Sequence, residues 1–163
     1  MNALLDEVIA ALSPAPGEVM VDATFGAGGY TRAILASGAQ VIAFDRDPEA
    51  WTFAQALNDP RLTVVHAPFS TLIDALEALH LRQIDGVLLD LGVSSPQLDR
   101  RSRGFSYWDD APLDMRMDSS QSLTAAEVVN TYEVEDLTTI IATYGEERFA
   151  SRIAREIVAR RPL

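Results

Sequence analysis

The sequence predicts an α/β fold in which a parallel sheet carries helices on both faces. Short apolar runs alternate with amphipathic segments through the first half of the chain. The segments between the apolar runs are long enough for right-handed helical crossovers, which join parallel strands. A glycine cluster also follows the first apolar run directly, at the edge where such sheets bind ligands. These three observations predict a doubly wound sheet with strand order 3-2-1-4.

The elements can be assigned in chain order. An amphipathic helix comes first, with Asn2 as its expected N-cap, and the stretch SPAPGE ends it with two prolines and a glycine. Alternating apolar runs and amphipathic segments follow it. Strands are expected at 18–23, 40–45, 61–67 and 84–92, with helices at 30–36, 48–57 and 70–79 between them.

The fourth strand and the sequence after it make a contrast. DGVLLDLG, residues 85–92, is almost continuously apolar, which is typical of a strand buried on both faces. We expect a loop over 92–121 and then only helices, the first opened by a capping box of Thr124 and Glu127. These helices are expected at 123–130, 134–143 and 146–160. Since a central strand needs a neighbour on each side, we expect the chain to be a fragment of a longer protein.

Composition limits the classes of protein to consider. The 163 residues include no cysteine, which excludes disulfides and thiolate metal sites. No apolar run approaches the roughly 20 residues that span a bilayer, and the acidic N-terminal segment does not resemble a signal peptide. We therefore expect a cytoplasmic protein. The net charge of −11 counts against nucleic-acid binding by the whole surface of this chain alone.

The glycine turn after the first strand indicates a ligand class. Gly26, Gly28 and Gly29 precede a helix whose N-terminal N–H groups can face a ligand. The run G-A-G-G-Y-T lacks the third glycine of the dinucleotide pattern, which disfavours NAD. A P-loop is excluded because the sequence has no lysine. A nucleoside without a pyrophosphate fits better, and S-adenosylmethionine is such a molecule.

Three acids accompany this turn. Asp45 ends the second strand about twenty residues after the turn, where an acid accepts hydrogen bonds from ribose hydroxyls. At an exposed strand end it is expected to add little to stability. Asp22 is expected to hold the turn through backbone N–H groups, and Asp47 to N-cap the helix from Pro48. The alternative is a tight turn without a ligand, with Asp45 as a solvated cap.

The fourth strand brings further polar residues to the same edge of the sheet. Asp90 follows it, and Ser94, Ser95 and Gln97 come soon after. These acceptors suit an exocyclic amine, whose methylation from a sulfonium ion requires alignment more than acid or base catalysis. In the alternative interpretation Asp90 only caps the loop. Neither of the two histidines has a partner cluster, so no metal site is predicted.

Arginines and aromatic residues gather between positions 100 and 108. Guanidinium groups and aromatic rings both stack on unpaired bases, so this stretch is a candidate RNA contact. The arginines of the last predicted helix fit a solvated face instead. The stretch contains Arg100, Arg101 and Arg103, followed by Phe105, Tyr107 and Trp108.

Several motifs together resemble one family. DATFGAGGYTRAIL, AFDRDPEA, DLGVSSPQLD, PLDMRMD and YGEERFA are similar to the bacterial small-subunit ribosomal RNA methyltransferase H family, also called MraW. The resemblance implies a class I, Rossmann-like methyltransferase fold with a partial helical insertion. It also implies S-adenosylmethionine-dependent methylation of the exocyclic N4 of a cytidine in the decoding region of 16S rRNA.

Site residues and domains follow from the resemblance. It implies a cofactor-binding domain over 1–104 and the start of a helical RNA-recognition insertion over 105–163, with 16S rRNA of the small subunit as partner. The implied catalytic residues are Asp90, Ser94 and Ser95. The implied cofactor contacts are Gly28, Gly29, Tyr30, Asp45, Phe69, Asp90 and Gln97.

Two alternatives stay open beside this enzyme. Family members continue for roughly as many residues again, so the chain is alternatively a catalytically incomplete cofactor-binding fragment or an interaction module. A nucleotide-dependent oxidoreductase is the other alternative, disfavoured by the glycine spacing. An open sheet edge would also allow self-association. No membrane partner is expected.

Overall fold

The computed structural model describes residues 4–108 and 110–163, so the predicted N-cap Asn2 lies outside the described residues. The chain forms two compact units. The first comprises the residues up to Gln97 together with Met117–Ser119, and the second comprises Leu98–Arg116 and Ser120–Leu163. The functional domains predicted at 1–104 and 105–163 stay a prediction, since this division concerns packing and not function.

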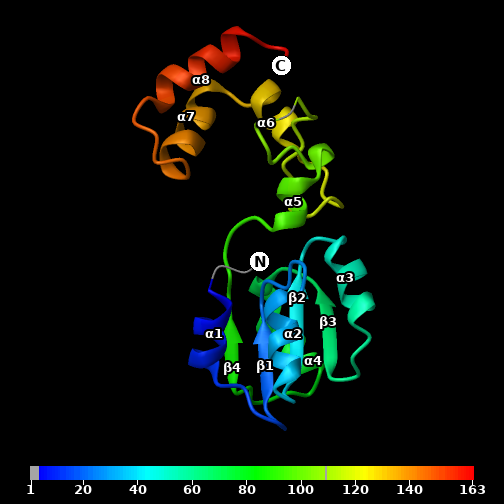
Figure 1. Ribbon diagram of the computed structural model, residues 1–163. Coiled ribbons are helices and arrows are strands. Elements are labelled where there is room, and N and C mark those ends of the chain that lie inside the picture. Colours follow the sequence, from blue (N-terminus) through cyan, green and yellow to red (C-terminus); the bar gives the residue numbers. More distant parts are fainter. Residues whose placement is uncertain (1–3, 109) are drawn as a thin grey trace. The chain divides into compact units, whose positions relative to one another are not determined.

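The first unit contains a sheet of four parallel strands in the order β3-β2-β1-β4, which confirms the predicted order (Figure 1). Val21 of β1 pairs with Ile42 of β2 on one side and with Val87 of β4 on the other. The carboxyl ends of all four strands therefore lie at one edge. The strands are β1 (Val19–Asp22), β2 (Gln40–Asp45), β3 (Leu62–His66) and β4 (Gly86–Leu88).

Helices cover both faces of this sheet, as the crossover pattern predicts (Figure 1). Met20, Val41 and Ala43 point to one face and pack in a cluster with residues of α1, α2 and α3. Val21, Ile42 and Phe44 point to the other face and pack with Leu76 of α4. The helices are α1 (Leu5–Leu12), α2 (Gly29–Ala36), α3 (Ala50–Leu57) and α4 (Leu72–Ala78), with a 3₁₀ turn η1 (Phe69–Thr71) before α4.

Strand β4 differs from its prediction. It is three residues long, against the expected range of 84–92. Leu88 is buried, but Val87 and Leu89 are 41% and 48% exposed, so the prediction of a strand buried on both faces is wrong. The reason is position: among the described strands β4 pairs only with β1, which makes it an edge.

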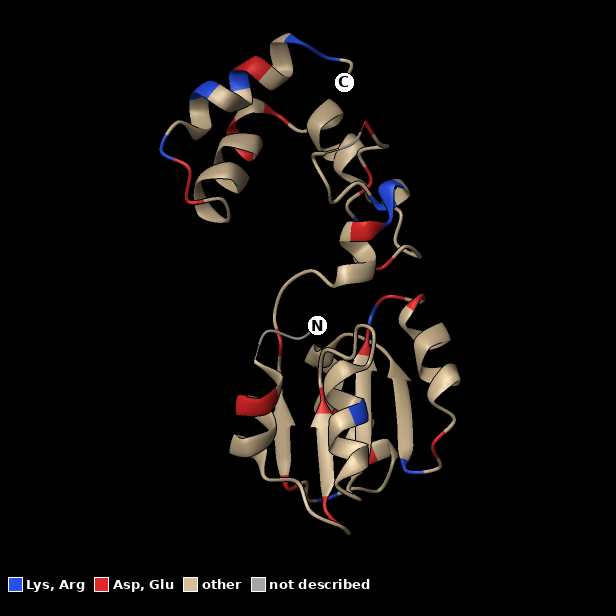
Figure 2. Cartoon of the chain, in the orientation of Figure 1, with Lys and Arg blue, Asp and Glu red and all other residues tan. Residues whose placement is uncertain are grey.

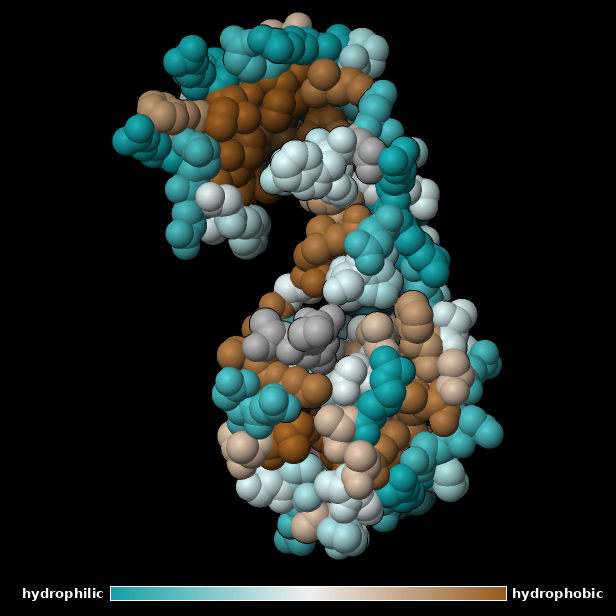
Figure 3. All heavy atoms as spheres, in the orientation of Figure 1, coloured by the Kyte–Doolittle hydropathy of each residue, from teal (hydrophilic) through white to brown (hydrophobic). Residues whose placement is uncertain are grey.

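The second unit is helical. The Oγ1 atom of Thr124 accepts a hydrogen bond from the backbone N–H of Glu127, which confirms Thr124 as the N-cap of α6. Helix α8 was predicted to begin at Glu146 but begins at Ala150. The backbone of Glu146 lies in the left-handed region, which is not helical. Apolar side chains gather where α7 and α8 pack together (Figure 3). The elements are η2 (Arg101–Arg103), α6 (Ala125–Thr131), α7 (Val134–Thr143) and α8 (Ala150–Ala159).

We expected a loop over residues 92–121, but part of this segment is regular. It contains the short helix α5 (Ser95–Asp99) and the 3₁₀ turn η2. Gln97 and Leu98 of α5 fall on either side of the boundary between the two units. The first three residues of α5 therefore belong with the sheet and contribute to its carboxyl edge.

Candidate active site

Asp22, the last residue of β1, organises the glycine turn that follows it. Its side chain is fully buried. Oδ1 accepts a hydrogen bond from the backbone N–H of Thr24 at 3.2 Å, and Oδ2 accepts one from the hydroxyl of Thr31 at 2.7 Å. The prediction that Asp22 holds the turn through backbone N–H groups is confirmed for Thr24.

Burial perturbs the titration of this acid. Desolvation raises the pKa of Asp22 to about 6, and the hydrogen bonds from Thr31 and Thr24 limit that rise. The nearby carboxylates of Asp45 and Asp90 push the pKa in the same direction as burial. Negative charge is therefore concentrated at the carboxyl ends of β1, β2 and β4.

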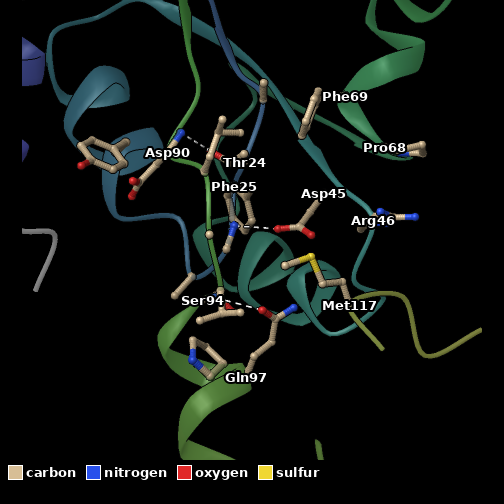
Figure 4. Close-up of a pocket in the computed structure, with 18 of the residues that line it drawn as sticks. Thr24, Phe25, Asp45, Arg46, Pro68, Phe69, Asp90, Ser94, Gln97 and Met117 are labelled. Atoms are coloured by element: carbon tan, nitrogen blue, oxygen red, sulfur yellow. Dashed lines mark hydrogen bonds between the residues drawn. The ribbon is translucent and has the colours of Figure 1, made fainter. Parts of the chain in front are cut away.

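Asp45, the last residue of β2, connects that strand to the glycine turn. Its Oδ2 accepts a hydrogen bond from the N–H of Gly26 at 2.7 Å (Figure 4). Its Oδ1 accepts one from the N–H of Asp47 at 2.9 Å. Burial is the main reason that the pKa of Asp45 is raised. Because a carboxylate has about four acceptor positions, these bonds leave Asp45 able to accept from a ligand as well.

The glycines of the turn have different roles. Gly29 lines the pocket described below, whereas Gly28 is not one of its lining residues. Gly28 has a φ of +75°, and a Cβ atom there would lie 2.7 Å from the buried ring of Phe25. Gly28 therefore allows the turn to close on Phe25, and its predicted contact with the cofactor stays a prediction.

We expect Gly28→Ala to destabilise the chain by roughly 1–3 kcal/mol, because it combines left-handed strain with a clash against the Phe25 ring. Chemical denaturation measures the change. Gly17→Ala is the matched control, since Gly17 also has a positive φ of +90° but has no atom within 4 Å of the added Cβ. Equal losses in the two variants would show that packing against Phe25 contributes nothing.

A pocket of about 660 Å³ lies at the carboxyl edge of the sheet, within the first unit. This volume falls in the range of roughly 300–1,000 Å³ typical of small-molecule sites. The pocket brings together all the predicted cofactor and catalytic residues except Gly28. Those residues are Gly29, Tyr30, Asp45, Phe69, Asp90, Ser94, Ser95 and Gln97.

The loop after β4 is held against the glycine turn. The backbone N–H of Asp90 donates to the hydroxyl of Thr24 at 2.8 Å, which leaves the Asp90 carboxylate outside that bond (Figure 4). The carboxylate is exposed and lines the pocket. Ser94 and Ser95 follow on the same rim. The predicted catalytic residues therefore lie on one side of the pocket.

Gln97 braces this loop. Its side chain is 5% exposed, its Oε1 accepts from the N–H of Ser94, and its Nε2 donates to Asp47 at 2.9 Å. Asp47 in turn accepts from the N–H of Glu49. Helix α3 begins at Ala50, so the prediction that Asp47 is the N-cap of a helix from Pro48 is wrong: its side chain caps the preceding turn.

Aromatic side chains form other parts of the pocket wall. Phe69 is partly exposed and follows Pro68 at the carboxyl end of β3 (Figure 4). Tyr30 is buried at the start of α2, and burial raises the pKa of its hydroxyl, as do the carboxylates of Asp90 and Asp22. The wall therefore offers an aromatic face near Asp45 and a protonated phenol near Asp90.

Sequence reasoning missed several residues of this pocket, among them Thr24, Arg46 and Met117. Thr24 belongs to the turn and Arg46 follows Asp45 directly, so both could have been found by extending the strand-end argument by one or two residues. The strand-end argument could not find Met117, because this residue joins the first unit only after a segment of the second unit. The PLDMRMD motif was the only sequence feature that included it. Among the described residues that line the pocket, Arg46 is the only cation.

The three candidate RNA-contacting arginines lie in the second unit (Figure 2). Arg100 and Arg101 are exposed. Arg103 is 6% exposed, and its Nη2 donates to the carbonyl oxygen of Arg116 at 2.8 Å. Arg103 therefore holds the loop, and of the three arginines only Arg100 and Arg101 have exposed side chains, so their contact with RNA stays a prediction.

The groups that line the pocket indicate the chemical class of its ligand. Carboxylates at two strand ends suit hydroxyl and amine donors, the turn offers backbone N–H groups, and Phe69 offers an aromatic face. Over residues 4–108 and 110–163, no group of three potential metal ligands occurs. No helix in the described part of the chain is long and apolar enough to cross a membrane. The residues present fit a cationic nucleoside.

Comparison with known proteins agrees with this geometry. The model of the MraW methylase family matches residues 1–163. The chain belongs to the MraW methylase family. It is 54% identical to the ribosomal RNA small subunit methyltransferase H of Aromatoleum aromaticum (strain DSM 19018 / LMG 30748 / EbN1), over 99% of this chain and 53% of that protein. It is 53% identical, with the same coverage, to the protein of that name from Azoarcus sp. (strain BH72). The chain therefore spans about half the length of these relatives.

Proposed function

We propose that this chain supplies the S-adenosylmethionine site and the methyl-transfer residues of a small-subunit rRNA methyltransferase. The observation that carries the proposal is the joining of Asp45, the glycine turn and Asp90 in one pocket. Membership of the MraW methylase family and the names of the two relatives support it.

The proposed orientation of S-adenosylmethionine follows from the pocket. Asp45 would accept hydrogen bonds from the ribose hydroxyls, Phe69 would lie against the adenine, and Gly29 with the start of α2 would face the amino-acid end. Bound there, S-adenosylmethionine supplies an electrophilic methyl group on a positively charged sulfur. The carboxylates of Asp45 and Asp90 favour that positive charge.

Asp90 is the proposed catalytic residue, with Ser94 and Ser95 beside it. Its exposed carboxylate accepts a hydrogen bond from an exocyclic amine and turns the nitrogen lone pair toward the methyl group. After transfer, the amine loses one proton to Asp90 or to water. A carboxylate acceptor suits an exocyclic amine, and the proposed target is the amine that the family resemblance implies, N4 of a cytidine in the 16S rRNA decoding region.

The second unit is the proposed RNA-contacting part, through Arg101 on η2 and Arg100 directly before it. The proposed partner is 16S rRNA or the small subunit, in the cytoplasm.

A catalytically incomplete cofactor-binding fragment is the second candidate function, because the chain covers 53% of the length of its relatives. Self-association through β4 is a further proposal, since that strand is the edge of the described sheet.

A methyl-transfer assay with radiolabelled S-adenosylmethionine and small ribosomal subunits tests the enzyme proposal. We expect Asp90→Asn to reduce transfer by roughly 10- to 100-fold while cofactor affinity changes less, because the loss falls on alignment of the acceptor. The fold should survive, since the structural bond of Asp90 comes from its backbone N–H. Nucleoside analysis of the product identifies the methylated atom.

The same assay separates the candidate functions. Cofactor binding without transfer to any small-subunit preparation would favour the cofactor-binding fragment. If Asp90→Asn reduced cofactor affinity and methyl transfer by the same factor, Asp90 would be a cofactor contact without a role in aligning the acceptor.

A further inference from the structure

The loop after η2 has a firmly held base. Gly104 has a φ of +71°, and a Cβ atom there would overlap the carbonyl oxygen of Pro112. The N–H of Met115 donates to the carbonyl of Arg103 at 2.9 Å, and the Arg103 side chain bonds the carbonyl of Arg116. The two ends of the loop are therefore joined by the backbone and by a buried guanidinium group.

A second set of bonds fixes this base to α6. Arg116 pairs with both carboxylate oxygens of Asp114, at 2.9 Å and 2.6 Å, and this guanidinium lowers the pKa of Asp114 to about 2. The N–H of Ala125 donates to the carbonyl of Asp114 at 2.8 Å. The loop is thus tied to the first turn of the helix that follows it.

The tip of the loop presents two aromatic rings to solvent. Tyr107 is 85% exposed and Trp108 is 81% exposed. Their ring centroids lie 5.0 Å apart with an angle of 31° between the planes. Two large adjacent aromatics on a held loop are unfavourable in water, and such residues are typical of binding surfaces.

The chemistry around the rings indicates the partner. Arg100 and Arg101 are exposed just before the anchored Arg103, so the start of the loop carries positive charge, which attracts phosphate. At the tip Asp110 is exposed, which disfavours phosphate there. A face for a neutral ring next to a site for phosphate matches a nucleotide whose base is unpaired.

We propose that Tyr107 and Trp108 form a stacking platform for an unpaired RNA base, while Arg100 and Arg101 contact the neighbouring phosphates. The platform rests on the proposed function, because it names the surface through which the second unit recognises RNA. It favours single strands over duplexes, since paired bases do not expose their faces to a protein ring.

Trp108 can report its own contact. The chain has two tryptophans, Trp51 and Trp108, so Trp51→Phe leaves Trp108 as the only tryptophan. Titration of this variant with single-stranded oligocytidylate should quench the tryptophan fluorescence, and the duplex of that strand with oligoinosinate should quench it much less. Trp108→Ala and Tyr107→Ala, each with Trp51 intact, should weaken binding of oligocytidylate by roughly 10-fold, measured by anisotropy of labelled RNA.

Two controls make the outcomes decisive. Arg100→Gln and Arg101→Gln should reduce the dependence of affinity on salt but leave the quenching in place. Unchanged RNA affinity in both aromatic variants, or equal quenching by the duplex, would overturn the platform. Cofactor binding, measured separately, should be unaffected in the aromatic variants. If the unmodified chain did not bind the cofactor, that result would contradict the proposed function but would not affect the platform.

Discussion

Asp45→Ala is expected to weaken S-adenosylmethionine binding by roughly 10- to 100-fold and also to lower the stability of the chain. The affinity falls because charge-assisted hydrogen bonding to the ribose is lost, which contributes about 1.5–3 kcal/mol in all. The stability falls because the N–H groups of Gly26 and Asp47 lose their acceptor. Calorimetric titration measures the affinity, and a thermal melt measures the stability.

Asp85→Ala is the matched control for this prediction. Asp85 precedes β4 at the opposite edge of the sheet, where its Oδ2 accepts a hydrogen bond from the N–H of Val19 at 2.8 Å. Its loss removes a comparable bond from a carboxylate to the backbone without touching the pocket. Stability should fall in both variants, and affinity only in Asp45→Ala. Unchanged affinity in a folded Asp45→Ala chain would mean that the ribose is held elsewhere.

Asp22→Asn is expected to be more stable than the unmodified chain at pH 7. The pKa of Asp22 is about 6 in the folded chain, against an ordinary value of 3.8. Between these values the folded state holds a proton that the unfolded state has released, so stability falls as pH rises from about 4 to 6. The difference between these two pKa values lowers the free energy of unfolding by about 3 kcal/mol once the pH is above both of them. Asparagine removes this loss, while its oxygen can still accept from Thr24 and its amide can donate to Thr31.

Denaturant unfolding of both chains from pH 4 to pH 7.5 measures this effect. The difference between the two chains isolates Asp22, because the other carboxylates are common to both. Thr31→Val should raise the pKa of Asp22 further, since the Thr31 hydroxyl favours the ionised carboxylate. A difference that does not change with pH would contradict the argument and mean that water or local motion solvates Asp22.

The fold was predictable where its signals are local. Alternating apolar runs and right-handed crossovers predict a parallel sheet, and the glycine turn after β1 indicates that the strand order reverses there, as it does. Asp45 and Asp90 were predictable for the same reason, because residues that follow parallel strands must meet at one edge. The strand β4 was predicted too long and too buried, since the burial of a strand depends on neighbours that its own residues do not specify.

Other features depend on contacts between distant segments. Met117 reaches the pocket only because the chain returns from the second unit, and no spacing rule indicates that path. The role of Gly28 depends on the ring of Phe25, and the role of Gln97 depends on Asp47. Asp45 was expected to matter little for stability, but its bond to Gly26 could be seen only once the turn was folded.

The central claim is that the pocket at the carboxyl edge binds S-adenosylmethionine. Calorimetric titration of S-adenosylmethionine into the unmodified chain tests it most directly, repeated in the presence of S-adenosylhomocysteine and of NAD. We predict saturable binding at one site, competition by S-adenosylhomocysteine and none by NAD, because the turn lacks the dinucleotide glycine pattern. Absence of binding to the folded chain, or equal competition by NAD, would contradict the account.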